Sequence, residues 1–231
     1  MKRFANLLVD LDGTVTDPFE GIAGCIRHAM RCMKLEEPQE DELRGAIGPP
    51  LRQSFGRLLA RHRAEGQVED AMRFYRERFS TVGLLENRVY SGVPEMLCEL
   101  NRMGSRLFIA TSKPTVFARR IVDHFGLSEH FACVYGSELD GRLESKGDLI
   151  RFVLDQEGIG AEDVVMIGDR SHDVVGAKTN GISAIGVTWG YGSRVELEGA
   201  DVRCDSPGEV IRFLAGDSGG VAVAVRSAVR A

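Results

Sequence analysis

The stretch Leu7-Leu8-Val9-Asp10-Leu11-Asp12-Gly13-Thr14 places two carboxylates directly after an apolar run near the N-terminus. The run from Phe4 to Val9 lacks polar alternation, which is typical of a strand buried on both faces of a sheet. Asp10 and Asp12 share a direction if the chain stays extended between them, and Gly13 then permits a tight turn. Neighbouring carboxylates repel each other unless a cation or a shared proton separates them, which favours a metal site. A simple turn capped by Asp gives the same pattern, so this stretch alone leaves both interpretations open.

The composition predicts an ordinary globular protein, with one large domain or a core and a small companion. Of 231 residues, 43% are hydrophobic and 27% charged, and 29 basic against 34 acidic side chains give a net charge of −5. Both signs are scattered and no basic patch with interleaved aromatic residues is present, so nucleic-acid binding is not expected. Five dispersed cysteines form no CxxC pair. No apolar run approaches the roughly 20 residues that span a membrane. We therefore expect a cytoplasmic protein without a membrane or nucleic-acid partner.

Two patterns of hydrophobicity divide the chain. From Pro18 to about Gly83 apolar residues recur at helical spacing, which predicts a bundle of four helices. From Tyr90 onward, short apolar runs alternate with helices of about ten residues, as in a parallel, doubly wound sheet. The predicted strands after the first are 106–111, 132–136, 164–167, 184–187 and 200–203. We therefore predict an α/β fold with a Rossmann-like core (1–15 and 86–215), an inserted all-helical cap (16–85) and a flexible tail (216–231).

Polar side chains follow several predicted strands at the point where each one ends. They are Asp10 and Asp12 after the first, Thr111 and Ser112 after the second, and Asp169 and Asp173 after the fourth; Lys146 opens the helix that follows the third. Because ligands bind at the carboxyl ends of the strands in open α/β sheets, these residues are expected around one crevice. Each has an ordinary structural explanation alone, such as a cap or a surface lysine, but their coincidence at one edge favours a site. Oxygen ligands without Cys or a His cluster suit Mg²⁺ rather than Zn²⁺. The Thr111 hydroxyl, the Lys146 ammonium and backbone N–H groups of the turn at Gly13 would hold phosphate oxygens.

These residues resemble the four ordered motifs of the haloacid dehalogenase superfamily. The resemblance rests on Asp10-Leu11-Asp12-Gly13-Thr14, Thr111, Lys146 and Gly168-Asp169 with Asp173, and it covers the chain from about Lys2 to Leu214. Within the superfamily, three further stretches resemble the phosphoglycolate phosphatase branch and its 5′-nucleotidase-like members. They are Ile47-Gly48-Pro49-Pro50-Leu51, Thr111-Ser112-Lys113-Pro114 and Gly186-Val187-Thr188-Trp189-Gly190-Tyr191-Gly192.

The resemblance implies a magnesium-dependent phosphatase. Asp10 would be the nucleophile that forms an aspartyl-phosphate intermediate, and Asp12 would be the general acid and base. The implied metal-site residues are Asp10, Leu11 through its backbone carbonyl, Asp12, Asp169 and Asp173. The implied phosphate-binding residues are Thr111, Ser112, Lys146 and Gly13. Family dehalogenases lack the second aspartate, so Asp12 argues against dehalogenation.

The cap is expected to set substrate specificity. Gly48 and Pro49 lie in a turn that would reach over the crevice, with Arg52 as a candidate anion contact. Thr16-Asp17 and the segment 84–87 would form the two linkers on which the cap moves. The expected partner is a small phosphorylated metabolite, either 2-phosphoglycolate or a nucleoside 5′-monophosphate, and the protein would be a monomer or homodimer.

Two other functions fit part of the pattern. A phosphomutase of the same fold would return the phosphoryl group to a sugar through Asp12. A receiver-type signalling module also clusters aspartates, a Thr or Ser and a Lys around magnesium. Receivers are much shorter and have no helical insertion after the first strand, so the cap weighs against that alternative.

Overall fold

The structure, a computed structural model, describes residues 4–217 and 222–223. At its centre is a seven-stranded sheet of order β5-β4-β1-β6-β7-β8-β9, in which every neighbouring pair is parallel except β8 and β9. The strands are β1 (Asn6–Val9), β4 (Arg106–Pro114), β5 (Cys133–Ser137), β6 (Val164–Gly168), β7 (Ser183–Val187), β8 (Val202–Cys204) and β9 (Ala222–Val223). The predicted α/β fold with a doubly wound parallel sheet is confirmed.

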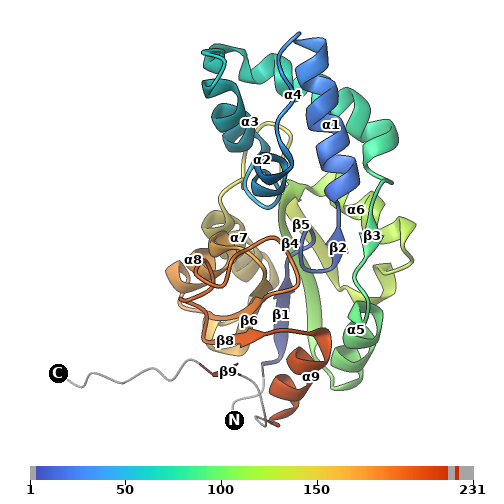
Figure 1. Cartoon of the computed structure of the whole chain (residues 1–231). Helices are drawn as coiled ribbons and strands as arrows, with labels where there is room; N and C mark the ends of the chain where they lie inside the picture. The colour runs from blue at the N-terminus through green and yellow to red at the C-terminus, as the bar shows by residue number, and fades with distance from the viewer. Residues whose placement is uncertain (1–3, 218–221, 224–231) are drawn as a thin grey trace, which may run out of the picture.

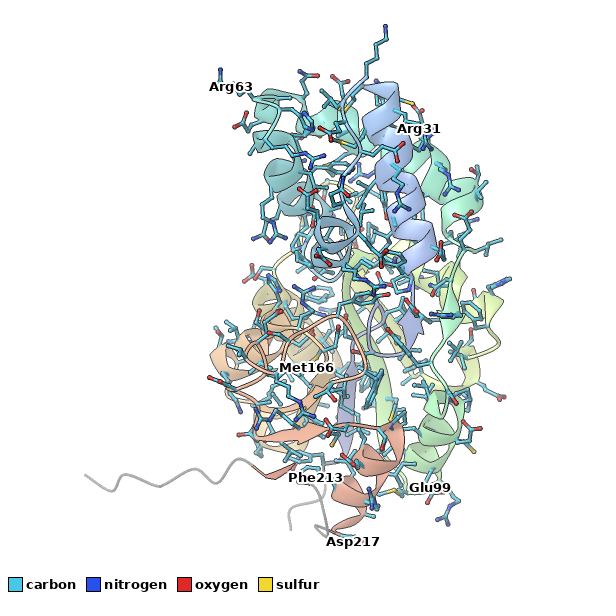
Figure 2. All side chains as sticks on the ribbon, viewed as in Figure 1. Arg31, Arg63, Glu99, Met166, Phe213 and Asp217 are labelled. Atoms are coloured by element: carbon cyan, nitrogen blue, oxygen red, sulfur yellow. The ribbon has the colours of Figure 1, made fainter. Side chains whose placement is uncertain are left out.

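Helices cover both faces of this sheet (Figure 1). They are α5 (Val93–Arg102), α6 (Thr115–His124), α7 (Lys146–Glu157), α8 (Ser171–Thr179) and α9 (Pro207–Ala215), with short turns η3 (Ser128–His130) and η4 (Ala161–Asp163). Successive strand residues point to opposite faces, so Leu8 and Met166 pack with α7 and α8, whereas Leu7 packs with α5, α6 and α9. Figure 2 shows Met166 inside the molecule. Burial on both faces explains why the strand sequences lack polar alternation.

Between β2 and β3 the chain forms a separate group of helices, which we call the helical insertion (residues 19–83). It consists of α1 (Phe19–Cys32), α2 (Glu40–Gly45), α3 (Leu51–Ala60), η1 (Glu65–Gln67), α4 (Val68–Arg78) and the π-helical turn η2 (Phe79–Gly83). Figure 1 shows these helices above the end of the sheet, and in Figure 2 Arg31 and Arg63 mark the end of the insertion farthest from it. The apolar stripes seen in the sequence, such as Ile26, Met30 and Met72, are fully buried between the helices.

Two short strands connect the insertion to the sheet domain. β2 (Thr16–Asp17) pairs in the antiparallel direction with β3 (Arg88–Val89), and we call these strands the linker pair. The Arg88 guanidinium lies across the pair, with Nη2 2.6 Å from Asp17 Oδ2. The segment 84–87, predicted as the second linker, forms a turn instead, so the strand begins just beyond it.

Other element boundaries differ from the predicted ones. β4 continues to Pro114, three residues beyond the expected end at Thr111, and β8 begins at Val202 rather than at Ala200. β9 lies within the predicted tail and adds an antiparallel strand beside β8; residues 218–221 and 224–231 of the tail lie outside the described residues. In the described part of the chain, no helix combines the length and hydropathy needed to cross a lipid bilayer.

Candidate active site

The sheet order brings the predicted site residues to one edge. β4 and β6 are the two neighbours of β1, so the residues that follow these three strands lie next to each other. Asp10 follows β1, Asp169 follows β6, and Thr111 lies in the last part of β4. All three side chains are buried. Residues that are about 160 positions apart in the sequence are therefore neighbours because the strands are parallel and adjacent.

Three carboxylates form the centre of this site. Asp10, Asp169 and Asp173 each offer an oxygen atom, these atoms lie within 4.8 Å of one another, and the three residues are 4%, 0% and 2% exposed. Burial raises the pKa of Asp169 well above its usual value, and the nearby charges of Asp10 and Asp173 raise it further. Burial and the charge of Asp173 also raise the pKa of Asp10, against the opposing effect of Lys146. Such a buried cluster of hard oxygen donors fits a divalent metal ion, which would offset the repulsion.

The first turn is shaped to make room for this cluster. Gly13 has φ of +90°, and a Cβ at this position would overlap the Asp169 carboxylate. Its N–H donates to the Thr16 carbonyl oxygen at 2.8 Å, so this donor is already used within the turn. The predicted role of Gly13 as a phosphate-binding donor is therefore not supported; its contribution is space beside Asp169.

The Leu11 carbonyl oxygen is also occupied within the turn. It accepts the backbone N–H groups of Val15 and Thr16, each at 2.9 Å, and that of Thr14 at 3.4 Å. A carbonyl oxygen has two lone pairs, so these bonds already use its capacity as an acceptor. We therefore remove Leu11 from the predicted metal ligands. A side-chain pattern could not have shown this, because the conflict arises from the backbone of the turn.

Lys146 is buried in the same site and bridges two of the carboxylates. Its Nζ donates to Asp10 Oδ1 at 2.7 Å and to the Ala110 carbonyl at 2.8 Å, and lies 2.8 Å from Asp173 Oδ1. Burial by itself lowers the pKa of Lys146, but the charges of Asp10 and Asp173 outweigh burial and raise it. Lys146 therefore remains an ammonium group that fixes Asp10 and adds positive charge where an anionic substrate group would lie.

Asp12 lies beside this cluster and has a partner that the sequence analysis missed. Asp12 Oδ2 is 2.7 Å from Nζ of the buried Lys113, whereas Asp12 Oδ1 is buried and has no hydrogen-bond partner. Asp12 does not belong to the carboxylate cluster formed by the described residues, so its side chain is better placed for proton transfer than for metal binding. Lys113 follows Thr111 by two positions on β4, and strand alternation could have predicted that both face the site.

A cavity of about 70 Å³ lies between the sheet edge and the helical insertion. Its lower wall includes Asp10, Asp12, Thr111, Ser112 and Lys113. Its upper wall comes from the insertion and includes Ala46, Gly48, Pro49, Leu51, Met72, Tyr75, Arg76 and Phe79. The Tyr75 and Phe79 rings stack with centroids 5.2 Å apart, so part of the upper wall is a rigid aromatic surface.

Of the three predicted specificity residues in the insertion, the cavity includes two. Gly48 and Pro49 line it, whereas Arg52 does not. Arg52 points instead to an exposed ion pair with Glu69. Arg76 of α4 lines the cavity and was not predicted; its Nη2 donates to the Leu139 carbonyl at 3.3 Å. Arg76 therefore lines this cavity and Arg52 does not; a role of either residue in specificity stays a prediction.

Comparison with known proteins identifies the family. The family model for haloacid dehalogenase-like hydrolases matches residues 7–187. A Pseudomonas aeruginosa protein named 5′-nucleotidase is 49% identical over 84% of this chain and 87% of its own. Tyrosine-protein kinase PtkA of Mycobacterium tuberculosis is 39% identical over 80% of this chain, which spans 62% of that protein. A phosphoglycolate phosphatase of Vibrio parahaemolyticus is 25% identical over 89% of this chain and 94% of its own.

A solved structure supports the same assignment. The crystal structure of a protein described as a predicted phosphatase from Clostridium acetobutylicum superposes with a TM-score of 0.87. Its sequence is 37% identical, and the match covers 93% of this chain and all of that one. The chain, with its buried aspartate cluster, the lysine beside it and the helical insertion, therefore belongs to the haloacid dehalogenase-like hydrolase family.

Proposed function

We propose that this protein is a magnesium-dependent phosphatase that acts on a small phosphate monoester through an aspartyl-phosphate intermediate. One observation carries the proposal. Asp10 lines the cavity, is paired with Lys146 and lies beside the carboxylates of Asp169 and Asp173, while Asp12, with its unpartnered oxygen, lines the same cavity. A nucleophile and a separate proton-transfer group next to one anion-binding space are the requirements of two-step phosphoryl transfer.

The proposed reaction assigns a role to each residue. A carboxylate oxygen of Asp10 attacks phosphorus, the bond from phosphorus to the leaving oxygen breaks, and Asp12 gives its proton to that oxygen. Asp12 then removes a proton from water, which attacks the aspartyl-phosphate, releases inorganic phosphate and regenerates Asp10. The Thr111 hydroxyl would donate to a transferring phosphoryl oxygen. Lys146, whose donors are directed to Asp10, Asp173 and the Ala110 carbonyl, would stabilise the phosphoryl group through its positive charge.

Asp10, Asp169 and Asp173 would hold Mg²⁺. Bound there, the ion would neutralise part of the charge on the phosphoryl group. Mg²⁺ is proposed rather than Zn²⁺ because the cluster contains only carboxylates. Without a cation, burial and the neighbouring carboxylates raise the pKa values of Asp10 and Asp169 and disfavour their charged forms. A bound divalent ion would lower these pKa values and keep both carboxylates charged, as ligand and nucleophile must be.

We propose a nucleoside 5′-monophosphate as the first substrate candidate. Tyr75 and Phe79 contribute aromatic, apolar atoms to the cavity wall, which a nucleobase could contact, and the relative that is 49% identical is named 5′-nucleotidase. 2-Phosphoglycolate is the second candidate, because Arg76 could pair with its carboxylate. Ligand pockets are typically about 300–1,000 Å³. The 70 Å³ cavity is much smaller, so residues 16–85 would act as a cap that moves aside for substrate entry.

A phosphate-release assay tests this function. We expect turnover on nucleoside 5′-monophosphates with Mg²⁺ and none with EDTA, and hydrolysis of p-nitrophenyl phosphate well beyond one equivalent. A receiver-type module would stop at one equivalent. Conversion of a sugar 1-phosphate to its isomer without free phosphate would identify a phosphomutase instead. Failure of every phosphate ester in the presence of Mg²⁺ would reject the proposed function.

A further inference from the structure

The segment 188–192 follows β7 and lies outside any helix or strand, yet it is packed closely on the site. The indole Nε1 of Trp189 donates to the Thr14 carbonyl at 3.0 Å. A Cβ at Gly190 would overlap the Gly13 carbonyl and the Asp169 carboxylate, and one at Gly192 would overlap the Asp169 carbonyl. The segment therefore fits against the first turn and against Asp169 with no space for side chains at these two positions.

Tyr191 forms hydrogen bonds with two different parts of the molecule, one through its backbone N–H and one through its side-chain hydroxyl. Its backbone N–H donates to Asp169 Oδ2 at 2.7 Å. Its hydroxyl group donates to Asp17 Oδ1, in β2 of the linker pair. One residue thus connects a carboxylate of the proposed metal site with the strand that leads into the helical insertion.

Asp17 extends this connection to both linkers and to the first helix. Its Oδ2 accepts Nε and Nη2 of Arg88, at 2.9 and 2.6 Å, which ties β2 to β3. Its Oδ1 also accepts the backbone N–H of Phe19, the first residue of α1, at 3.2 Å. Burial tends to raise the pKa of Asp17, but the bonds from Tyr191, Arg88 and Phe19 outweigh burial and lower it, so the acceptor is charged. The acceptor of the Tyr191 hydroxyl therefore also contacts β3 and the first residue of α1, which together form the base of the insertion.

We propose that Tyr191 is a positioning residue that couples the metal-binding carboxylate Asp169 to the linker pair that carries the cap. The proposal rests on the proposed function, because it takes Asp169 as a ligand of Mg²⁺. When Mg²⁺ fixes Asp169, the backbone of Tyr191 is fixed with it, and the hydroxyl then holds Asp17 and the base of the insertion. By thermodynamic reciprocity, releasing the hydroxyl weakens Mg²⁺ binding, because the linker pair no longer helps to hold Tyr191 against Asp169.

The variant Tyr191→Phe removes the hydroxyl and keeps the backbone bond to Asp169. We expect isothermal titration calorimetry to show Mg²⁺ binding weakened about fivefold or more. Asp17→Ala should weaken it similarly, and the double variant should be no weaker than either single one, because all three lack the same contact. If Asp17→Ala does not fold, Asp17→Asn, which keeps an acceptor oxygen, should bind Mg²⁺ more tightly than Tyr191→Phe. Tyr135→Phe is the matched control: it removes a hydroxyl that is hydrogen-bonded at 2.5 Å to Glu157, the last residue of α7, and it should bind Mg²⁺ as wild type does.

Turnover gives a second readout that a simple folding defect would not reproduce. The rate of p-nitrophenyl phosphate hydrolysis by Tyr191→Phe should be low at limiting Mg²⁺ and recover at saturating Mg²⁺, since excess metal restores the bound state by mass action. The coupling would be wrong, with the proposed function unaffected, if Tyr191→Phe bound Mg²⁺ with wild-type affinity. The same would follow if the loss of Mg²⁺ affinity in the double variant equalled the product of the losses in the two single variants. Lack of Mg²⁺ binding by the wild-type protein would overturn the proposed function and the coupling together.

Discussion

The edge of the sheet and the wall of the helical insertion face the same cavity but are built differently. At the sheet edge the ion pair of Lys146 and Asp10 is buried, with side chains 4% and 6% exposed. In the insertion the pair of Arg52 and Glu69 has side chains that are 49% and 71% exposed. A buried charge must be paired because its desolvation is costly, whereas an exposed pair contributes about 0–1 kcal/mol. The Lys146–Asp10 pair is therefore held in place by burial, whereas the Arg52–Glu69 pair can be substituted with little effect on stability.

We propose that the sheet edge carries the chemistry and that the insertion sets the preference among substrates. Substitutions at the sheet edge should therefore lower turnover on every substrate. Substitutions in the wall of the insertion should change the preference among substrates and leave the chemical step nearly unchanged.

The largest effect should come from Asp10→Asn, which keeps the shape of the side chain and removes the nucleophilic charge. We expect turnover to fall on the order of 10⁶-fold, the loss seen when another hydrolase loses its nucleophile. The loss should be equal for all substrates, as measured by phosphate release. Circular dichroism should show a native spectrum, and activity above a few per cent of wild type would remove Asp10 from the nucleophile role.

The second-largest effect on turnover should come from removal of the metal ion. Chelation with EDTA should abolish measurable turnover, because the proposed ion contributes several kcal/mol to the reaction barrier. It should also lower the melting temperature: a ligand at about 100 times its Kd stabilises the folded state by roughly 2.7 kcal/mol. Differential scanning calorimetry with and without Mg²⁺ measures this shift. A melting temperature that is the same with and without Mg²⁺ would show that the carboxylate cluster does not bind the ion.

The sequence could predict the sheet edge more fully than the insertion. Parallel order alone brings Asp10, Thr111 and Asp169 together, because each lies at or near the carboxyl end of a strand and the strands share a direction. The failures at this edge concern the backbone: the Leu11 carbonyl and the Gly13 N–H are used within the turn, which no pattern of side chains reveals. In the insertion, the sequence did not predict the direction in which the arginine side chains point. Arg52 and Arg76 both lie on helices, and the direction of each depends on how the helices pack, which spacing within one helix does not determine.

A smaller effect is expected from Asp12→Asn, because general acid–base catalysis contributes about 10²–10⁴-fold. The loss should depend on the leaving group. p-Nitrophenolate departs without protonation, so this variant should release up to one equivalent of it rapidly and then turn over slowly. Stopped-flow absorbance measures that burst. A loss of the same size on alkyl and aryl phosphates, with no burst, would contradict the role of Asp12 as the acid.

The smallest effects test the two arginines of the insertion against each other. Arg76→Gln removes a cation that lines the cavity. We expect KM to rise severalfold on 2-phosphoglycolate, whose carboxylate Arg76 would pair with, and to change little on p-nitrophenyl phosphate, which has no carboxylate. Arg52→Gln removes a partner of an exposed ion pair, so stability should change by about 0–1 kcal/mol and KM should stay at the wild-type value. Steady-state kinetics on both esters distinguishes the two variants. If Arg52→Gln changes KM and Arg76→Gln does not, the cavity wall observed between sheet and insertion is not the surface that substrates meet, and specificity must be sought on the exposed face of α3 instead.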